Sequence, residues 1–167
     1  APREAESGVT MVIASGGDRI AFNDIAIGDV FLCSGQSNMA RKMSLAALRP
    51  DDQKPEIDKS IRLLTVPSVS SQTEQGDLRR DATWARATDG WLDFSAVCLF
   101  TGRTIAESED VTVGLINSAW GGTAIRAWMP YESLAMAGGS QDWLAILDDY
   151  RRDPETAEAV LAETISH

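Results

Sequence analysis

The sequence is poor in the residues that build metal and nucleotide sites. Its 167 residues include one histidine and two cysteines, which are too few for a zinc cage, and its carboxylates are scattered along the chain. Neither a Gly-x-Gly-x-x-Gly nor a Gly-x-x-x-x-Gly-Lys run occurs, so the usual fingerprints of nucleotide binding are missing. We therefore expect no metal and no cofactor.

Positive charge and long apolar runs are also scarce. Fifteen basic against twenty-five acidic residues give a net charge of -10, which repels nucleic-acid phosphates and anionic lipid head groups. No apolar run approaches the roughly 20 residues needed to cross a bilayer, and the first residues lack a basic-then-apolar leader. Nucleic acid and membranes are therefore not expected partners. A mature secreted chain would also lack a leader, so these features leave the localisation open.

The two cysteines fall in segments that we expect to be buried. Cys33 ends a strand-like run, and Cys98 lies inside a helical pattern. Buried cysteines behave as small apolar side chains, so we expect two free thiols and no disulfide.

The length suits one domain of mixed strands and helices. Residues 9–14 and 19–27 are strand-like runs on either side of Ser15-Gly16-Gly17-Asp18, which predicts a hairpin. Three further strands are expected at 30–33, 61–66 and 111–116. Helical patterns follow the first of these strands, over residues 38–48, and precede the last, where Asp93 or Ser95 caps a helix ending near Ser108. This alternation predicts a parallel sheet wrapped by helices.

Polar or aperiodic stretches separate these elements. Residues 49–59 and 68–80 read as loops. Two more helices are expected after the sheet, one from Gln141 and one from Pro154.

The most informative segment leads from a strand directly to a serine. Residues 30–33 have the continuous apolar pattern of a strand covered on both faces, and Ser34-Gly35 supplies a tight turn. Ser37 follows at the expected helix start. Backbone N–H groups at a helix N-terminus favour an anion, so an oxyanion formed at Ser37 would find a donor in its own main chain.

Three segments together carry a family resemblance. They are Cys33-Ser34-Gly35-Gln36-Ser37-Asn38-Met39, residues 91–96 and residues 114–128. Each is similar to a motif of the sialate O-acetylesterases, a branch of the SGNH hydrolases. The resemblance implies an incomplete three-layer α/β sandwich of SGNH (flavodoxin-like) type around a parallel sheet. It implies a serine carbohydrate esterase that removes O-acetyl groups from sugars, with an extracytoplasmic (periplasmic, secreted or lysosomal) location.

Relatives in this family are several times longer. By resemblance, residues 1–27 are the tail of an upstream β-sandwich domain, and residues 28–167 are the amino-terminal part of the esterase domain. We therefore expect an excised or processed piece. Its open sheet edge and apolar helix faces predict a complementary chain or self-association.

The resemblance assigns Ser37 as the catalytic nucleophile. Backbone N–H groups of Ser37, Ser95, Gly121 and Gly122 would form the oxyanion hole, although each motif could also be a plain turn. Many SGNH enzymes add an asparagine side chain in the third motif. Here the candidates for that donor are Asn117 and Thr123.

Substrate contacts are predicted at Gln36, Thr123 and Arg126. Arg126 would suit a carboxylate-bearing sugar through forked hydrogen bonds, against the commoner case of a surface arginine. Trp120 and Trp128 could stack on a sugar or pack against the sheet.

The catalytic base is not evident. In the resembled family it belongs to an Asp-x-x-His motif, whereas Thr164 stands three residues before the only histidine, His167. We therefore do not assign the base to His167. The alternative function is a non-catalytic chain that binds an acetylated glycan or a partner chain.

Overall fold

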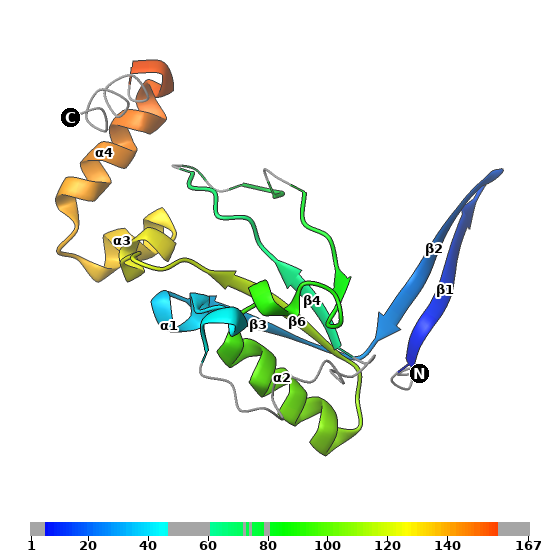
Figure 1. Ribbon diagram of the computed structural model, residues 1–167. Coiled ribbons are helices and arrows are strands. Elements are labelled where there is room, and N and C mark those ends of the chain that lie inside the picture. Colours follow the sequence, from blue (N-terminus) through cyan, green and yellow to red (C-terminus); the bar gives the residue numbers. More distant parts are fainter. Residues whose placement is uncertain (1–5, 47–60, 72, 74, 79–80, 157–167) are drawn as a thin grey trace. The chain divides into compact units, whose positions relative to one another are not determined.

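The computed structural model describes residues 6–46, 61–71, 73, 75–78 and 81–156. They belong to two compact units, one drawn from Ala1–Ser68 and Arg80–Gly122 and the other from Val69–Arg79 and Thr123–His167. The hairpin and the sheet lie in the first unit, which carries the serine motif (Figure 1).

The predicted hairpin is confirmed. Strand β1 (Glu6–Ser15) pairs antiparallel with β2 (Asp18–Ile27), and Ser15 lies opposite Asp18 across the turn. Gly16 has a φ of 63° there, a left-handed conformation that glycine adopts without steric cost.

The predicted α/β fold with a mostly parallel sheet is also confirmed. The sheet has the order β3-β6-β4-β5, with β3 (Asp29–Gly35), β6 (Val113–Ala119) and β4 (Ile61–Thr65) parallel. The two-residue strand β5 (Ala85–Arg86) adds to β4 in the antiparallel sense. It lies beyond the predicted 68–80 loop, and two residues are too few to show the alternating apolar and polar pattern that predicts a strand.

Helix α2 (Ala96–Glu109) covers one face of the sheet (Figure 1). Gly102 of α2 sits directly on Leu115 of β6, since a Cβ built at Gly102 would lie 2.6 Å from Leu115 Cδ1. The glycine thus sets how closely helix and sheet approach. The buried cluster comprises Met43, Ile61, Leu63, Ala87, Phe94, Ala96, Cys98, Leu99, Ala106, Val113 and Leu115.

The opposite face of β3 is not covered by the described residues. Val30 and Leu32 are 60% and 67% exposed. This corrects the expectation of a strand buried on both faces. Among the described residues, Trp84 packs over Gly114 next to Val30 but leaves most of Val30 and Leu32 uncovered.

The helix expected over residues 38–48 is much shorter in the structure. Helix α1 spans Ser37–Ala40, and the chain is extended again at Arg41. Lys42 then pairs with Ser95 in an isolated antiparallel bridge before the 3-10 helix η1 (Met43–Leu45). Pairing with a segment distant in sequence therefore overrides local helix propensity here. The whole of the predicted 49–59 loop, like residues 47–48, lies outside the described residues.

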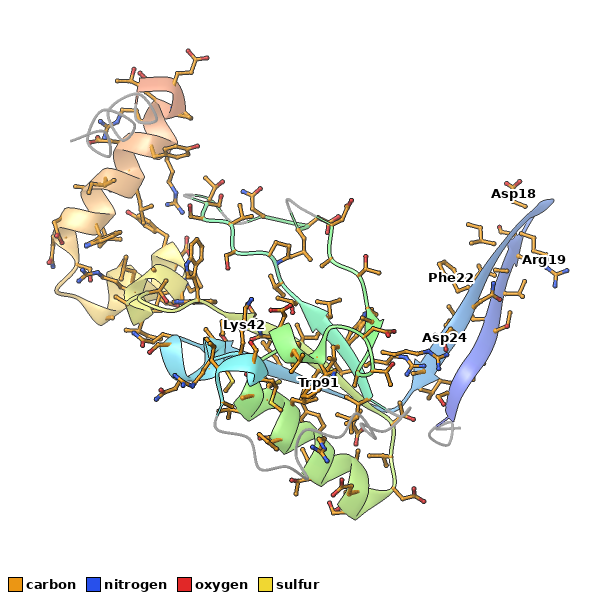
Figure 2. The ribbon with its side chains drawn as sticks, in the orientation of Figure 1. Asp18, Arg19, Phe22, Asp24, Lys42 and Trp91 are labelled. Atoms are coloured by element: carbon orange, nitrogen blue, oxygen red, sulfur yellow. A yellow bond between two sulfur atoms is a disulfide. The ribbon has the colours of Figure 1, made fainter. Side chains whose placement is uncertain are left out.

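An ion-pair cluster joins the hairpin to the sheet. Asp24, near the end of β2 that leads into β3 (Figure 2), accepts two hydrogen bonds from Arg86 and one from the buried Arg62. Asp24 has a φ of 58°, which is uncommon outside glycine. Both arginines contact the carboxylate of this residue.

The second unit is helical. It contains the 3-10 helix η4 (Ile125–Trp128), α3 (Tyr131–Ala137) and α4 (Gln141–Arg152). The helix predicted from Gln141 is confirmed, whereas most of the one predicted from Pro154 lies outside the described residues. Helix α3 was not expected from the sequence.

Candidate active site

Ser37 is exposed at the carboxyl end of β3, where the strand turns into α1. The turn depends on Gly35, whose φ of 149° disfavours other residues and whose Cα faces Met39. The Ser37 hydroxyl donates to Gln36 Oε1 at 2.6 Å, and the Ser37 N–H donates to the same oxygen at 3.1 Å. An amide oxygen therefore occupies the position next to both the hydroxyl and the main-chain donor.

The double-glycine turn after β6 lies beside this serine. A Cβ built at Gly121 would be 3.6 Å from Ser37 Cα and 3.8 Å from Ser37 Cβ. The Trp120 N–H donates to the Gly35 carbonyl at 3.0 Å, which ties the two turns together. Gly122 has a φ of 82°, so a side chain there would strain the backbone. The first and third motifs thus meet at the carboxyl ends of β3 and β6, as expected for parallel strands.

Ser95, from the second motif, is fully buried. Its Oγ accepts from the Cys98 N–H at 3.2 Å, which confirms the predicted cap of α2, and donates to Met39 Sδ at 3.6 Å. The bridge between Lys42 and Ser95 is closed by the bonds Met43 N–H to Phe94 O and Ala96 N–H to Arg41 O. In this pattern the Ser95 N–H points away from Lys42, so the bridge itself does not use that donor.

Two further links join the same segments. Lys42 Nζ (labelled in Figure 2) lies 2.9 Å from Asp93 Oδ1 in an exposed ion pair. Cys33 and Cys98 form a disulfide between β3 and α2, with their Cα atoms 5.9 Å apart. The expectation of two free thiols was wrong, because the register of β3 against α2 brings together two cysteines separated by 65 residues. That register is a tertiary property, which residue types and spacing do not reveal.

Asn117 is one of the two proposed side-chain donors of the third motif. It lies on β6 directly opposite Cys33, is 7% exposed, and within the described part of the chain its Oδ1 has no hydrogen-bond partner. The other candidate, Thr123, belongs to the second unit, where its Oγ1 accepts from Trp128 Nε1 at 2.8 Å.

Arg126 lies in the second unit. Its guanidinium carbon is 4.8 Å from the centroid of the Trp143 ring on α4, a cation-π distance. Trp128 and Trp143 are 39% and 40% exposed. Sequence reasoning missed Trp143 as the partner of Arg126, because the two residues belong to different helices.

The described residues supply no acid–base pair for Ser37. The only histidine, His167, lies outside them. Among the described residues, no cluster of histidine, cysteine, aspartate and glutamate could hold a metal ion. No helix in the described ranges is both long enough and apolar enough to cross a membrane.

Comparison with known families returns a match over most of the chain. A family model described as "Carbohydrate esterase, sialic acid-specific acetylesterase" matches residues 27–151. Sialate O-acetylesterase of Mus musculus is 34% identical over an alignment of 124 residues, and the match covers 70% of this chain and 23% of that protein. The Homo sapiens protein of the same name is 35% identical over an alignment of 128 residues, and the match covers 70% of this chain and 24% of that protein.

A solved structure agrees with the sequence matches. A carbohydrate acetylesterase from Xanthomonas citri superposes with a TM-score of 0.69 at 31% identity, over 78% of this chain and 30% of that one. The chain thus spans about a quarter of the length of the curated relatives it matches.

Proposed function

This chain belongs to the sialic acid-specific acetylesterase family of carbohydrate esterases, and from this premise we propose that it carries the nucleophile and oxyanion hole of a serine O-acetylesterase. The substrate is an O-acetylated sugar, and sialic acid is the sugar that the family description favours. The observation that carries the proposal is the exposed Ser37 hydroxyl beside the Gly121 turn.

The reaction uses Ser37 Oγ as the nucleophile. Oγ attacks the acetyl carbonyl carbon, its proton passes to a base, and the carbonyl oxygen becomes an oxyanion. Collapse of this intermediate expels the sugar hydroxyl with a proton, and water then releases acetate from the acetylated serine. The base lies outside the described residues.

The oxyanion is stabilised by main-chain donors. We assign this role to the N–H groups of Ser37, Gly121 and Gly122, which lie in exposed turns, because preorganised donors aimed at a developing charge lower its energy without reorganisation. The family resemblance adds the N–H of Ser95, a residue that is itself fully buried. The oxyanion takes the place of Gln36 Oε1, which already accepts from the Ser37 N–H at 3.1 Å. Gln36 therefore has to release this N–H when substrate binds, and its side chain then becomes a proposed contact of the sugar.

A second candidate function is a non-catalytic chain that binds an acetylated glycan. The observation that favours it is the partner of the Ser37 hydroxyl, which is the neutral amide of Gln36 rather than a base. An unactivated serine is a weak nucleophile.

The test measures acetate release from an O-acetylated sialic acid. It compares the wild-type protein that contains this chain with its Ser37→Ala variant. We expect release by the wild type and a loss of at least about 10³-fold in the variant. Equal turnover by the two proteins contradicts the esterase. Tight sugar binding without Ser37-dependent release establishes the binding alternative.

We also propose an extracytoplasmic location. The Cys33–Cys98 disulfide supports it, because disulfides persist in oxidising compartments and are rare in the cytosol. Fractionation of the source cells tests the proposal, and recovery in the cytosol with both thiols reduced contradicts it.

A complementary segment or a second copy is proposed to cover the exposed face of β3. Val30 and Leu32 support this, since more than half of each side chain is exposed. Sedimentation of the isolated chain is expected to show association, and a stable monomer contradicts it.

A further inference from the structure

We propose that the Cys33–Cys98 disulfide is a positioning element of the active site, which holds the Ser37 turn and the Ser95 turn in one fixed geometry. The inference rests on the proposed esterase function, and it adds a role that the family match does not assign. A carbonyl oxygen can be stabilised by two main-chain donors only if both reach the same point, about 2.7 to 3.1 Å from it.

A closed ring of bonds surrounds the nucleophile. From Cys33 the disulfide leads to Cys98, whose N–H donates to Ser95 Oγ at 3.2 Å. Ser95 Oγ donates to Met39 Sδ at 3.6 Å, and the main chain from Met39 back to Cys33 contains Ser37. Ser37 therefore lies inside a ring that has only one covalent link between its two segments among the described residues.

The disulfide anchors the chain before Ser37, and the Lys42–Ser95 bridge anchors the chain after it. The bridge holds the chain after α1 through two backbone hydrogen bonds, Met43 to Phe94 and Ala96 to Arg41. The disulfide holds β3, before Ser37. With the bridge alone, the start of α2 keeps one hydrogen-bonded anchor beside its packing on the sheet. The disulfide adds a covalent anchor in the segment before Ser37.

The other links near the ring are too weak to replace the disulfide. A thioether sulfur is a poor acceptor, so the Ser95–Met39 contact contributes little. The Lys42–Asp93 pair has side chains 51% and 77% exposed, where solvent screens the attraction. Loss of the disulfide is therefore expected to change the geometry of the site and not only its stability.

The experiment is a double-mutant cycle on acetate release at 25 °C, in the protein that contains this chain, with Cys33→Ala, Cys98→Ala and the double variant. Each variant is expected to lose about tenfold in kcat with KM changed less than about twofold, because a misplacement of about 1 Å can cost up to 10²-fold in rate. The double variant should match the single ones, since either change removes the same bond. Unchanged kcat, or losses that multiply in the double variant, overturns the proposal.

Leu115→Ala is the matched control. It removes a fully buried side chain on β6 that faces α2, so it lowers the melting temperature without touching the ring. It is expected to keep its kcat. An equal loss of kcat in this control means that lowered stability explains the cysteine variants, which also overturns the proposal.

Amide hydrogen exchange provides a readout that needs no turnover. Faster exchange is expected at residues 36–40 and 95–98 in the cysteine variants and not in Leu115→Ala. If the wild type releases no acetate, the proposed function fails, and this exchange pattern still decides the positioning role. Unchanged exchange in both segments contradicts it. If the cysteine variants do not fold, the wild-type protein is reduced with a phosphine instead. The reduced protein should show the same faster exchange.

Discussion

Gly121 lies directly beside Ser37. A Cβ built at Gly121 would be in van der Waals contact with Ser37, 3.6 Å from its Cα and 3.8 Å from its Cβ. In the proposed esterase the acetyl group approaches Ser37, so a larger side chain at position 121 would stand next to the reacting atoms.

Gly121→Val is therefore expected to lower kcat/KM by at least about tenfold, because its methyl groups occupy the approach to Ser37. Kinetics on an O-acetylated sugar measure the loss. Gly76→Val is the control, since nothing lies within 4 Å of a Cβ built there and its activity should not change. Full activity in Gly121→Val would place the acetyl group elsewhere.

Gly102→Ala is expected to destabilise the protein. An alanine gains about 1 kcal/mol over glycine in a helix, but its Cβ would be 2.6 Å from Leu115, and overpacking of a core costs about 1–3 kcal/mol. Denaturant unfolding measures the balance. Adding Leu115→Val should recover part of the loss, whereas a stabilised single variant would mean that helix and sheet separate easily.

Asp24→Asn is expected to lower the free energy of unfolding by about 1–3 kcal/mol, because the buried Arg62 and the half-exposed Arg86 both lose a carboxylate that pairs with them. The estimate is below that for a fully buried pair since Asp24 and Arg86 are each 44% exposed. Asparagine tolerates the left-handed backbone, so the change isolates the charge. Asp18→Asn in the hairpin turn is the control, and an equal effect of both would refute the anchoring role.

The sequence alone predicted the elements that residue type and local pattern specify. The hairpin, β4 and α4 follow from local periodicity and turn residues, and Ser95 caps α2 as its type predicts. The turn that presents Ser37 was predicted because Gly35 and Ser37 belong to one short motif.

The features that the sequence did not predict depend on contacts between distant segments. Helix α1 ends at Ala40 because Lys42 pairs with Ser95. The disulfide depends on how α2 is placed against β3, and the exposure of Val30 depends on what packs over its face of the sheet. Residue type and spacing contain none of this information.

In the second unit, the pKa of Tyr131 is raised above its ordinary value of 10.0, first because its hydroxyl is hydrogen-bonded to Asp148 and also because of partial desolvation and that negative charge. The folded state thus favours the neutral phenol. This contribution to stability is complete below the unfolded pKa near 10 and is lost as the pH rises through the folded value.

Asp148→Asn is expected to bring the pKa of Tyr131 down towards 10, because the leading causes of the shift are removed. Ultraviolet titration of the phenolate in a Tyr150→Phe background isolates this group, since the chain has two tyrosines. Asp142→Asn is the control. No change in the titration would mean that Asp148 is not the partner.

Covalent labelling shows whether Ser37 is an activated nucleophile. The protein that contains this chain is treated with an organophosphonate, and the modified residue is located by mass spectrometry of its peptides. One adduct is expected, on Ser37, which is absent from Ser37→Ala and forms in step with the loss of acetate release. An adduct on another serine, or complete loss of activity with Ser37 unmodified, would contradict it.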